Sequence, residues 1–352
     1  MNAKPSLVIN GRRIGAGERP YIIAELSANH NGSLDRALEV IDAAHRAGAD
    51  AIKLQTYTAD TMTIDSNAPD FRIQGGLWDG RTLYDLYREV HTPWEWHPLL
   101  FERGRKHGMA VFSTPFDETA VDFLETLDAP AYKIASFELL DLRLIRRVAR
   151  TCKPMIISTG LASLDEIGEA VSAARSSGAR EIALLHCISA YPTPANEANL
   201  QMIGLLAKAF DVPVGLSDHT LDIGVAIAAV ASGAVLIEKH FTLSRADGGA
   251  DSAFSAEPAE LAALVRNAAL AAAASDAEGF RRGASEEASR TFRRSLYVVA
   301  DIPAGGRFTQ ANVRAIRPGF GLPPKYYDEV MGKTASRAIL RGTPLSWNLI
   351  GK

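Results

Sequence analysis

The sequence predicts an α/β fold, a (β/α)8 TIM barrel followed by a small C-terminal domain. Eight short apolar runs of the β type recur between residues 21 and 240, and amphipathic helical segments separate them. After about residue 270, an alanine-rich, charged stretch gives way to short strand-like runs and turns. We therefore expect a barrel over residues 1–280, a linker over 281–291 and a compact domain over 292–352.

The alternation of elements can be followed along the chain. In order, the expected strands are YIIAEL (21–26), AIKLQT (51–56), MAVFST (109–114), AYKIAS (131–136), PMIIST (154–159), IALLHC (182–187), PVGLSD (213–218) and VLIEKH (235–240). Helices are expected between them, for example over 34–49 and 164–179, where apolar residues recur at three- and four-residue steps. Ser163 and Glu166 have the spacing of a capping box. Residues 57–108 form a long, aromatic-rich insertion, and an insertion of that length is usually functional or contains short elements of its own.

Composition excludes several classes of protein. A formal net charge of −3 over 352 residues gives no bulk attraction for nucleic acid or for an anionic membrane. Two cysteines are too few for a disulfide framework and indicate a reducing compartment. The N-terminal stretch lacks the apolar core of a secretion signal, and no apolar run is long enough to span a membrane. We expect a soluble cytoplasmic protein.

Polar residues gather where the expected strands end. In a barrel of this type the active site forms at the C-terminal ends of the strands, so these residues should share one mouth. They are Glu25, Lys53, Gln55, Ser113, Thr114, Lys133, Ser136, Ser158, Thr159, His186, Ser189, Ser217, Asp218, His219, Glu238, Lys239 and His240.

This mixture of side chains has a chemical meaning. His219 and His240 end successive strands, and two imidazoles there suit a divalent metal with open positions for water or substrate. Lys53 and Lys133, with the hydroxyl groups, suit a phosphate or a phosphate plus a carboxylate. Glu25 is a candidate acid or base.

Each of these residues also has a simpler interpretation. A single lysine at a strand end is often solvated, and a serine often only satisfies the backbone of a turn. His45, His97 and His107 are read as core or surface groups, and Cys187 as buried packing. Trp94 and Trp96 belong either to a lid or to the packing of the insertion.

A series of motifs in this order resembles the sialic acid synthase family, the nonulosonate synthases that condense phosphoenolpyruvate with an amino-sugar aldehyde. The motifs are IIAELSANHNGS, AIKLQTY, VFSTPFD, YKIAS, PMIISTG, HCISAYPTP, GLSDHT and EKHFTL. The tail from RSLYVV through IRPGFGL is similar to the antifreeze-like (SAF, β-clip) domain of these enzymes. The stretches QTYTADTMTID, LYDLYREVHTPWEWH, DGGADSAFS and GTPLSW resemble the pseudaminic acid branch, and Ser189 stands where the sialic branch usually has asparagine.

The resemblance implies a role for each candidate residue. Glu25, His219 and His240 would be catalytic, with the two histidines holding a divalent metal, most often Mn2+, with Mg2+ and Co2+ as alternatives. The residues implied for phosphoenolpyruvate are Lys53, Thr114, Lys133, Ser136, Ser158, Ser189 and Ser217. Those implied for the acceptor sugar are Gln55, Tyr191, Asp251 and Arg317. Arg317 would cross from the SAF domain of one subunit into the barrel of another, which implies a domain-swapped homodimer.

The resemblance implies a reaction that joins phosphoenolpyruvate, 2,4-diacetamido-2,4,6-trideoxy-L-altrose and water to give pseudaminate and phosphate by C–O cleavage. The nearest alternative is an N-acetylneuraminate or legionaminate synthase that takes a manno-configured acceptor. Two further alternatives are a metal-dependent aldolase that uses pyruvate and needs no phosphate pocket, and a carbohydrate-binding protein built on an inactive barrel.

Overall fold

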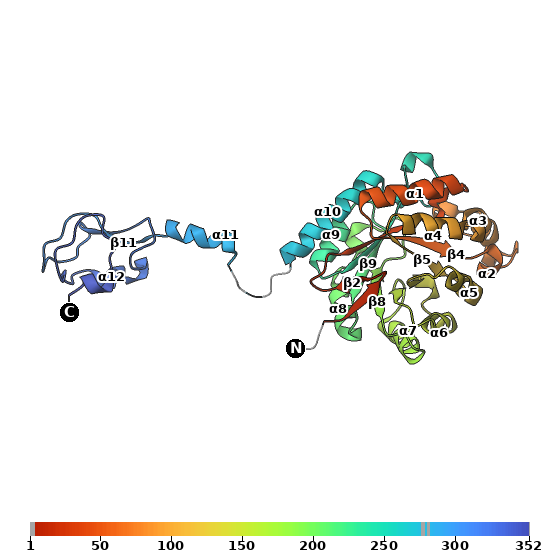
Figure 1. Cartoon of the computed structure of the whole chain (residues 1–352), viewed down its shortest axis with the longest axis horizontal. Helices are drawn as coiled ribbons and strands as arrows, with labels where there is room; N and C mark the ends of the chain where they lie inside the picture. Colours follow the sequence, from red (N-terminus) through yellow and green to blue (C-terminus); the bar gives the residue numbers. More distant parts are fainter. Residues whose placement is uncertain (1–3, 276–278, 280–281, 352) are drawn as a thin grey trace. The chain divides into compact units, whose positions relative to one another are not determined.

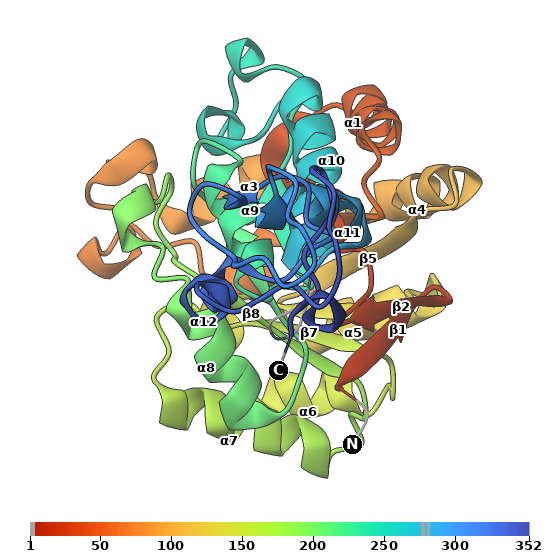
Figure 2. The same cartoon turned by 90° about the vertical axis from the view of Figure 1, so that its left-hand side faces the viewer.

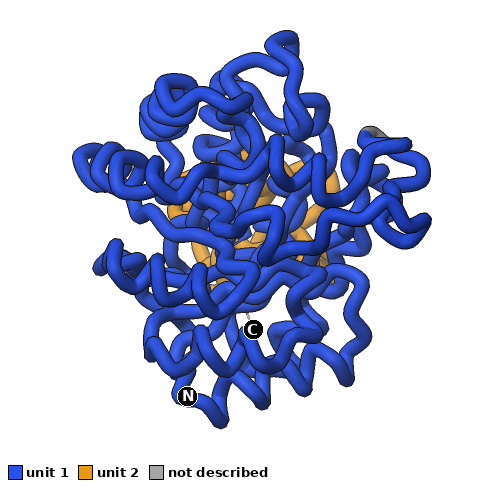
Figure 3. The backbone as a smooth tube through the Cα atoms, turned by 90° about the vertical axis from the view of Figure 1, so that its right-hand side faces the viewer, with its two compact units in different colours: residues 1–276 blue, residues 277–352 orange. Residues whose placement is uncertain are grey.

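The computed structural model describes residues 4–275, 279 and 282–351. The chain forms two compact units, residues 1–276 and 277–352 (Figure 3), and each is described by itself. Among the described residues, no helix is both long enough and apolar enough to cross a membrane.

Unit 1 is a closed barrel of eight parallel strands surrounded by helices (Figure 1), which confirms the predicted (β/α)8 fold. Around the barrel the order is β10-β3-β4-β5-β6-β7-β8-β9, so the last strand pairs with the first. The strands are β3 (Tyr21–Glu25), β4 (Ala51–Thr56), β5 (Ala110–Pro115), β6 (Tyr132–Ile134), β7 (Met155–Ser158), β8 (Ile182–Cys187), β9 (Val214–Asp218) and β10 (Leu236–His240).

One helix of the outer ring follows each strand. These helices are α1 (Leu34–Ala47), α4 (His97–Lys106), α5 (Glu118–Thr126), α6 (Leu142–Ala149), α7 (Leu164–Ser176), α8 (Gln201–Phe210), α9 (Gly224–Ala231) and α10 (Pro258–Ser275). Helices α6 and α7 lie side by side on the outside of the barrel (Figure 2). Helix α7 begins with the predicted capping box, in which Ser163 and Glu166 each accept a hydrogen bond from the other's backbone N–H.

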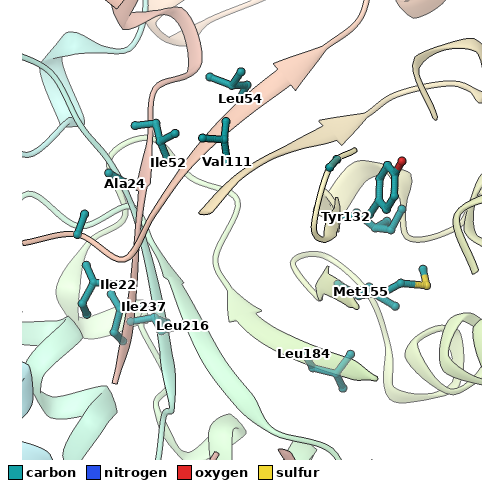
Figure 4. Close-up of a cluster of buried hydrophobic side chains, with 14 of the residues drawn as sticks. Ile22, Ala24, Ile52, Leu54, Val111, Tyr132, Met155, Leu184, Leu216 and Ile237 are labelled. Carbon is teal, nitrogen blue, oxygen red and sulfur yellow. The ribbon is translucent and has the colours of Figure 1, made fainter. Parts of the chain in front are cut away.

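Side chains alternate between two cores along each strand, as a period of two requires. One set faces the helices and includes Ile22, Ile52, Val111 and Ile237 (Figure 4). The residues between them form a separate cluster inside the barrel, which includes Tyr21, Ile23, Ala51, Phe112, Ile156, Leu185 and Leu236. This alternation decides which strand-end residues reach the mouth of the barrel.

A short antiparallel hairpin precedes the barrel and was not predicted. It consists of β1 (Ser6–Ile9) and β2 (Arg12–Gly15). Its side chains Leu7, Ile9 and Ile14 join the cluster inside the barrel, against residues that begin the strands. The hairpin therefore closes the end of the barrel opposite the mouth.

The insertion after β4 is shorter than predicted, because α4 is the regular helix between β4 and β5. The inserted part contains α2 (Ala59–Met62), α3 (Leu83–Val90) and three 3-10 turns. Trp94 stacks on Phe123 with a ring-centroid distance of 4.8 Å and donates its indole N–H to the carbonyl oxygen of Tyr57. Trp94 is thus a packing residue that fastens the insertion to the barrel.

Unit 2 is small and has few regular elements. It contains α11 (Ala284–Glu287), β11 (Ser295–Val298), β12 (Val313–Ile316) and α12 (Tyr327–Val330), and the two strands pair in antiparallel fashion. Its core includes Leu296, Val298, Phe308, Val313 and Leu345. Residues of the predicted linker that the structure describes include α11 and a 3-10 turn, Ala288–Phe292.

Candidate active site

The inner face of each strand continues past the core residues, every second position, to the mouth of the barrel, and the side chains at these last positions meet there. Glu25 follows Tyr21 and Ile23 in the two-residue period, and Lys53 follows Ala51. Glu238 and His240 follow Leu236 in the same way. The predicted gathering of lysines, hydroxyl groups, histidines and a carboxylate is therefore a consequence of strand period and barrel closure.

Two lysines and two carboxylates form a buried, charge-balanced cluster at this mouth. Lys53 Nζ lies 2.7 Å from Glu25 Oε2 and 3.8 Å from Glu238 Oε1. Lys133 Nζ also lies 3.8 Å from Glu238 Oε1, so Glu238 stands between the two lysines. All four side chains are almost completely buried, and a buried charge without a partner would be costly. The carboxylates therefore explain how the barrel can hold both lysines.

Burial and the charges of neighbouring groups shift the pKa values of these side chains in different directions. Burial raises the pKa of Glu25 above its ordinary value, although the charge of Lys53 opposes the rise. Burial lowers the pKa of Lys133. Burial also acts to raise the pKa of Glu238, but Lys133 and Lys53 outweigh it and lower the value. Glu25 is thus the carboxyl in the cluster more ready to carry a proton.

Hydroxyl groups line the mouth next to the lysines. Thr114 Oγ1 lies 3.2 Å from Lys53 Nζ, and Ser217 donates to Glu238 Oε1 at 3.0 Å. The Ser158 hydroxyl is buried and has no hydrogen-bond partner among the described residues. A polar ligand would satisfy this hydroxyl group.

Gly160, directly after β7, brings its backbone close to two more hydroxyl groups. Its N–H donates to Ser136 Oγ at 3.1 Å. A Cβ atom at this position would collide with Ser189 Oγ and lie 2.7 Å from Ser136 Oγ. Only glycine therefore leaves this side of the mouth open, next to Ser136 and Ser189.

His219 and His240 face each other across neighbouring strands, with ring centroids 5.5 Å apart. His219 Nδ1 lies 2.9 Å from the carbonyl oxygen of Ile188, and because a carbonyl only accepts, Nδ1 carries the proton and Nε2 is left for a ligand. His240 Nδ1 is buried without a hydrogen-bond partner in the described part of the chain. Burial, reinforced by the charge of His219, lowers the pKa of His240 well below its usual value. Neutral imidazole is the form that binds metals.

The basicity of His219 also fits a ligand role. Burial acts to lower the pKa of His219, but Cys187 and the Ile188 carbonyl outweigh it and raise the value. A hydrogen bond from the second ring nitrogen is the usual way in which a protein orients a metal-binding histidine. Among the described residues, no group of three or more His, Cys, Asp or Glu side chains is arranged to hold a metal ion.

Two of the four residues implied for the sugar, Tyr191 and Asp251, lie next to the histidine pair, and a third, Gln55, contacts Glu25. Gln55 donates to Glu25 Oε1 at 3.2 Å and to Ser27 Oγ at 2.8 Å. The ring of Tyr191 lies 4.3 Å from that of His219, measured between centroids. Asp251 Oδ2 lies 3.7 Å from His240 Nδ1. The fourth, Arg317, is an exposed residue of unit 2.

Several strand-end residues of the predicted set point away from the mouth. His186 lies on the helix-facing side of β8 and contacts the carbonyl oxygen of Ala198 at 2.7 Å. Ser113 pairs with Thr56, and Thr159 donates to the carbonyl oxygen of Leu185. Asp218 and Lys239 pair with each other. The expectation that all strand-end polar residues share the mouth was wrong for these five, because alternate residues of a strand face opposite sides.

Two residues at the mouth received no role from the sequence. Glu238 is the counter-ion of both lysines, and its two-residue spacing from His240 could have indicated that they share a face. The reading of Cys187 as packing was incomplete, because its Sγ lies 3.9 Å from His219 Nδ1 and 4.0 Å from Ser189 Oγ. A single cysteine gives no sequence signal that separates a packing residue from one that contacts the site.

Comparisons with known proteins agree with this geometry. The sequence model of the NeuB family matches residues 40–279, and that of the SAF domain matches residues 293–350. The chain is 45% identical over 328 residues to the pseudaminic acid synthase of Helicobacter pylori, covering 93% of this chain and 96% of that protein. It is 34% identical over 348 residues to the N,N'-diacetyllegionaminic acid synthase of Legionella pneumophila, covering 97% and 98%. The crystal structure of an N-acetylneuraminic acid synthetase from Leptospira borgpetersenii is similar with a TM-score of 0.74 and 33% identity, over 81% of this chain and 95% of that chain.

Proposed function

The chain belongs to the NeuB family, and on that premise we propose that it is a pseudaminic acid synthase. The reaction condenses phosphoenolpyruvate with 2,4-diacetamido-2,4,6-trideoxy-L-altrose and water, and it releases pseudaminate and phosphate. The greater identity to pseudaminic acid synthases than to a legionaminic acid synthase favours this acceptor over a manno-configured one. Family membership also makes a pyruvate aldolase or an inactive binding protein the weaker interpretation.

The observation that carries the proposal is a set of buried polar atoms at the mouth that have no hydrogen-bond partner among the described residues. Ser158 Oγ, Glu238 Oε2 and His240 Nδ1 are buried and lack a hydrogen-bond partner among the described residues. Buried polar atoms are nearly always paired in native proteins, so unpaired ones at a barrel mouth indicate a polar ligand.

Phosphoenolpyruvate is proposed to bind between the two lysines and the hydroxyl groups. Its phosphate and carboxylate would take positive charge from Lys53 and Lys133, as Glu25 and Glu238 do in the structure. The remaining contacts would come from Thr114, Ser136, Ser158, Ser189 and Ser217. The opening beside Gly160 leaves room for an oxygen-rich group next to Ser136 and Ser189.

A divalent metal, with Mn2+ as the first candidate and Mg2+ and Co2+ as alternatives, would be held by His219 and His240. His240 Nδ1, which is buried without a hydrogen-bond partner among the described residues, and His219 Nε2, which the Nδ1 hydrogen bond leaves for a ligand, fit such an ion. A metal bound there would supply Lewis acidity to the carbonyl oxygen of the acceptor aldehyde.

Glu25 is proposed to move the proton in the condensation. Carbon 3 of phosphoenolpyruvate attacks the aldehyde carbon, and the aldehyde oxygen becomes a hydroxyl group by taking a proton. Burial raises the pKa of Glu25, and a raised pKa suits a carboxyl group that donates this proton. Water then adds at the cationic carbon 2, and the proton that it loses returns to the Glu25 carboxylate. The C–O bond to phosphate breaks as the new carbon 2 hydroxyl becomes the keto group and its proton passes to the departing phosphate. Gln55 would hold Glu25 in place through the hydrogen bond to Oε1.

The acceptor is proposed to contact Gln55, Tyr191 and Asp251, with Arg317 supplied by a second subunit. Exposed apolar side chains follow strands β6, β7 and β9, namely Phe137, Leu140, Leu161 and Leu221. Phe292 and Phe320 are likewise exposed in unit 2, and Phe320 is close to Arg317 in the sequence. Apolar groups in water favour association, which supports a homodimer in which unit 2 of one subunit contacts the barrel of the other. Because phosphoenolpyruvate is an intracellular metabolite, the proposed location is the bacterial cytoplasm.

The test is phosphate release from phosphoenolpyruvate with Mn2+ and three acceptors in parallel. These are the L-altro diacetamido sugar, its D-manno counterpart and N-acetylmannosamine. Turnover with the first alone supports the proposal, and turnover with another acceptor moves the chain to a different branch. Formation of product from pyruvate, without phosphoenolpyruvate, would instead indicate an aldolase. The variant Lys133→Ala separates the synthase from the aldolase, because only the synthase loses a contact to the phosphate group of its substrate.

A further inference from the structure

Trp78 lies at the tip of a hairpin in the insertion after β4. The hairpin is closed by backbone hydrogen bonds from Ile73 N–H to the Arg81 carbonyl oxygen and from Gly80 N–H to the Ile73 carbonyl oxygen, both 2.9 Å. Arg72 and Thr82 form a bridge at its base, and Thr82 also caps helix α3 by accepting from Asp85 N–H. The hairpin is therefore fixed at its base and presents the 3-10 turn Gly76–Trp78 at its end.

The indole ring of Trp78 reaches across the mouth of the barrel. Trp78 follows β4, whereas Tyr191 follows β8, and these strands are four places apart in a closed ring of eight. Their rings nevertheless lie 6.5 Å apart, measured between centroids. Tyr191 in turn lies 4.3 Å from His219 and 6.2 Å from His240. Two residues from opposite sides of a barrel can meet in this way only above its mouth, next to the histidine pair.

The indole N–H of Trp78 is buried and has no hydrogen-bond partner among the described residues. The N–H of Trp94, in the same insertion, is instead bound to the carbonyl oxygen of Tyr57 at 3.2 Å. A buried donor left unpaired is costly, and indole can only donate, so the missing partner must be an acceptor. The indole N–H of Trp78 has no role in the reaction proposed above.

The surroundings of the indole indicate the chemistry of that acceptor. Tyr191 packs against Phe254 at a centroid distance of 5.2 Å, so Trp78, Tyr191 and Phe254 give the mouth an aromatic wall. An acetamido group presents a carbonyl oxygen to a donor and a methyl group to an aromatic face. A hydroxyl group offers an acceptor oxygen but has no methyl group for the aromatic face.

We propose that Trp78 is a specificity-determining residue that recognises an acetamido group of the acceptor sugar. Its N–H donates to the acetamido oxygen, and its ring contacts the acetamido methyl group. This inference rests on the proposed function, because it requires an amino-sugar acceptor bound near His219 and His240.

The experiment compares Trp78→Phe, Trp78→Ala and Gln74→Ala in the full-length, Mn2+-loaded enzyme. Gln74 is an exposed residue of the same hairpin and serves as the matched control. Trp78→Phe keeps an aromatic ring, although a smaller one, and removes the donor, so the KM for the acceptor should rise about fivefold, the effect of one net hydrogen bond. Trp78→Ala should raise it further, to about thirtyfold or more, because the aromatic contact is lost as well. The KM for phosphoenolpyruvate should stay within about twofold of the wild-type value, since the donor does not face that ligand.

Calorimetric titration of each variant with the acceptor in the absence of phosphoenolpyruvate provides a readout besides activity. The same ranking of affinities is expected. An acceptor KM and affinity unchanged in Trp78→Phe and Trp78→Ala, with wild-type turnover intact, would overturn the role of Trp78 alone. Failure of the wild-type protein to bind or turn over any of the three amino sugars would overturn the proposed function and, with it, this inference. Equal losses in Gln74→Ala would show a general effect of the hairpin and would also overturn the assignment.

Discussion

Lys239 Nζ lies 2.7 Å from Asp218 Oδ2, and both side chains are about 1% exposed. Lys239 also donates to the carbonyl oxygen of Thr220, while Thr220 donates to Asp218 Oδ1. Because Asp218 precedes His219 and Lys239 precedes His240, the pair joins β9 to β10 directly behind the two histidines. A buried ion pair on the outer face of the sheet thus fixes the register on which the inner face depends.

Removing one member of this pair should destabilise the protein more than removing both. Lys239→Met leaves the Asp218 carboxylate buried without its cation, and we expect a loss of about 3 kcal/mol or more in the free energy of unfolding. The double variant Asp218→Asn, Lys239→Met should recover a large part of that loss. Urea denaturation of the two proteins tests this, and an additive, larger loss in the double variant would contradict it.

Gly160→Ala should weaken binding of phosphoenolpyruvate while leaving the fold intact. The added methyl group would occupy the space beside Ser136 and Ser189, and we expect the KM for phosphoenolpyruvate to rise by about tenfold or more. Gly168→Ala is the matched control, because its methyl group would meet nothing nearer than an ordinary contact with Phe210, at 3.7 Å. The control should be neutral or slightly stabilising in helix α7. Equal kinetic constants for the two variants would argue against a ligand beside Gly160.

Stability should depend on pH through His97, which is fully buried between the insertion and the barrel. Nδ1 lies 3.1 Å from the Pro93 carbonyl oxygen, so it carries the proton, and Nε2 accepts from Thr56 at 2.9 Å. Burial lowers the pKa of His97 from 6.5 to about 4. Between these values the unfolded chain binds a proton that the folded chain does not, so stability falls as pH decreases from about 6.5 to 4 and is constant above that range.

The size of this effect can be measured against His97→Gln. A pKa shift of this size changes the free energy of unfolding by about 3 kcal/mol between pH 6.5 and 4. The free energy of unfolding of the wild-type protein should therefore fall more steeply with decreasing pH than that of the variant. Parallel curves for the two proteins between pH 6.5 and 4 would contradict the prediction.

Subunit mixing tests whether Arg317 acts in another subunit. Glu25→Gln and Arg317→Ala should each be nearly inactive as pure proteins. In a swapped heterodimer, one of the two sites would combine an intact barrel with an intact Arg317. Co-expression of the two variants should then give about a quarter of wild-type activity, since about half of the dimers would be mixed and half of their sites intact. Activity no greater than the sum of the pure variants would exclude a shared site.

Much of the fold could be predicted because it depends on local patterns. Apolar runs with a period of two predicted the strands, and steps of three and four residues predicted helices such as α7 with its capping box. Two histidines at the ends of successive strands were enough to predict that their rings would lie next to each other, because parallel neighbouring strands end side by side.

The sequence by itself therefore determined the barrel and the types of side chain that collect at its mouth. The tertiary structure decided which of them face the ligand: it directed His186 and the Asp218–Lys239 pair outward. It also placed Glu238 between two lysines from other strands and brought Trp78 to Tyr191 across the mouth. The physical reason is that secondary structure follows from spacing along the chain, whereas pairing of charges and donors depends on which distant strands the closed barrel brings together.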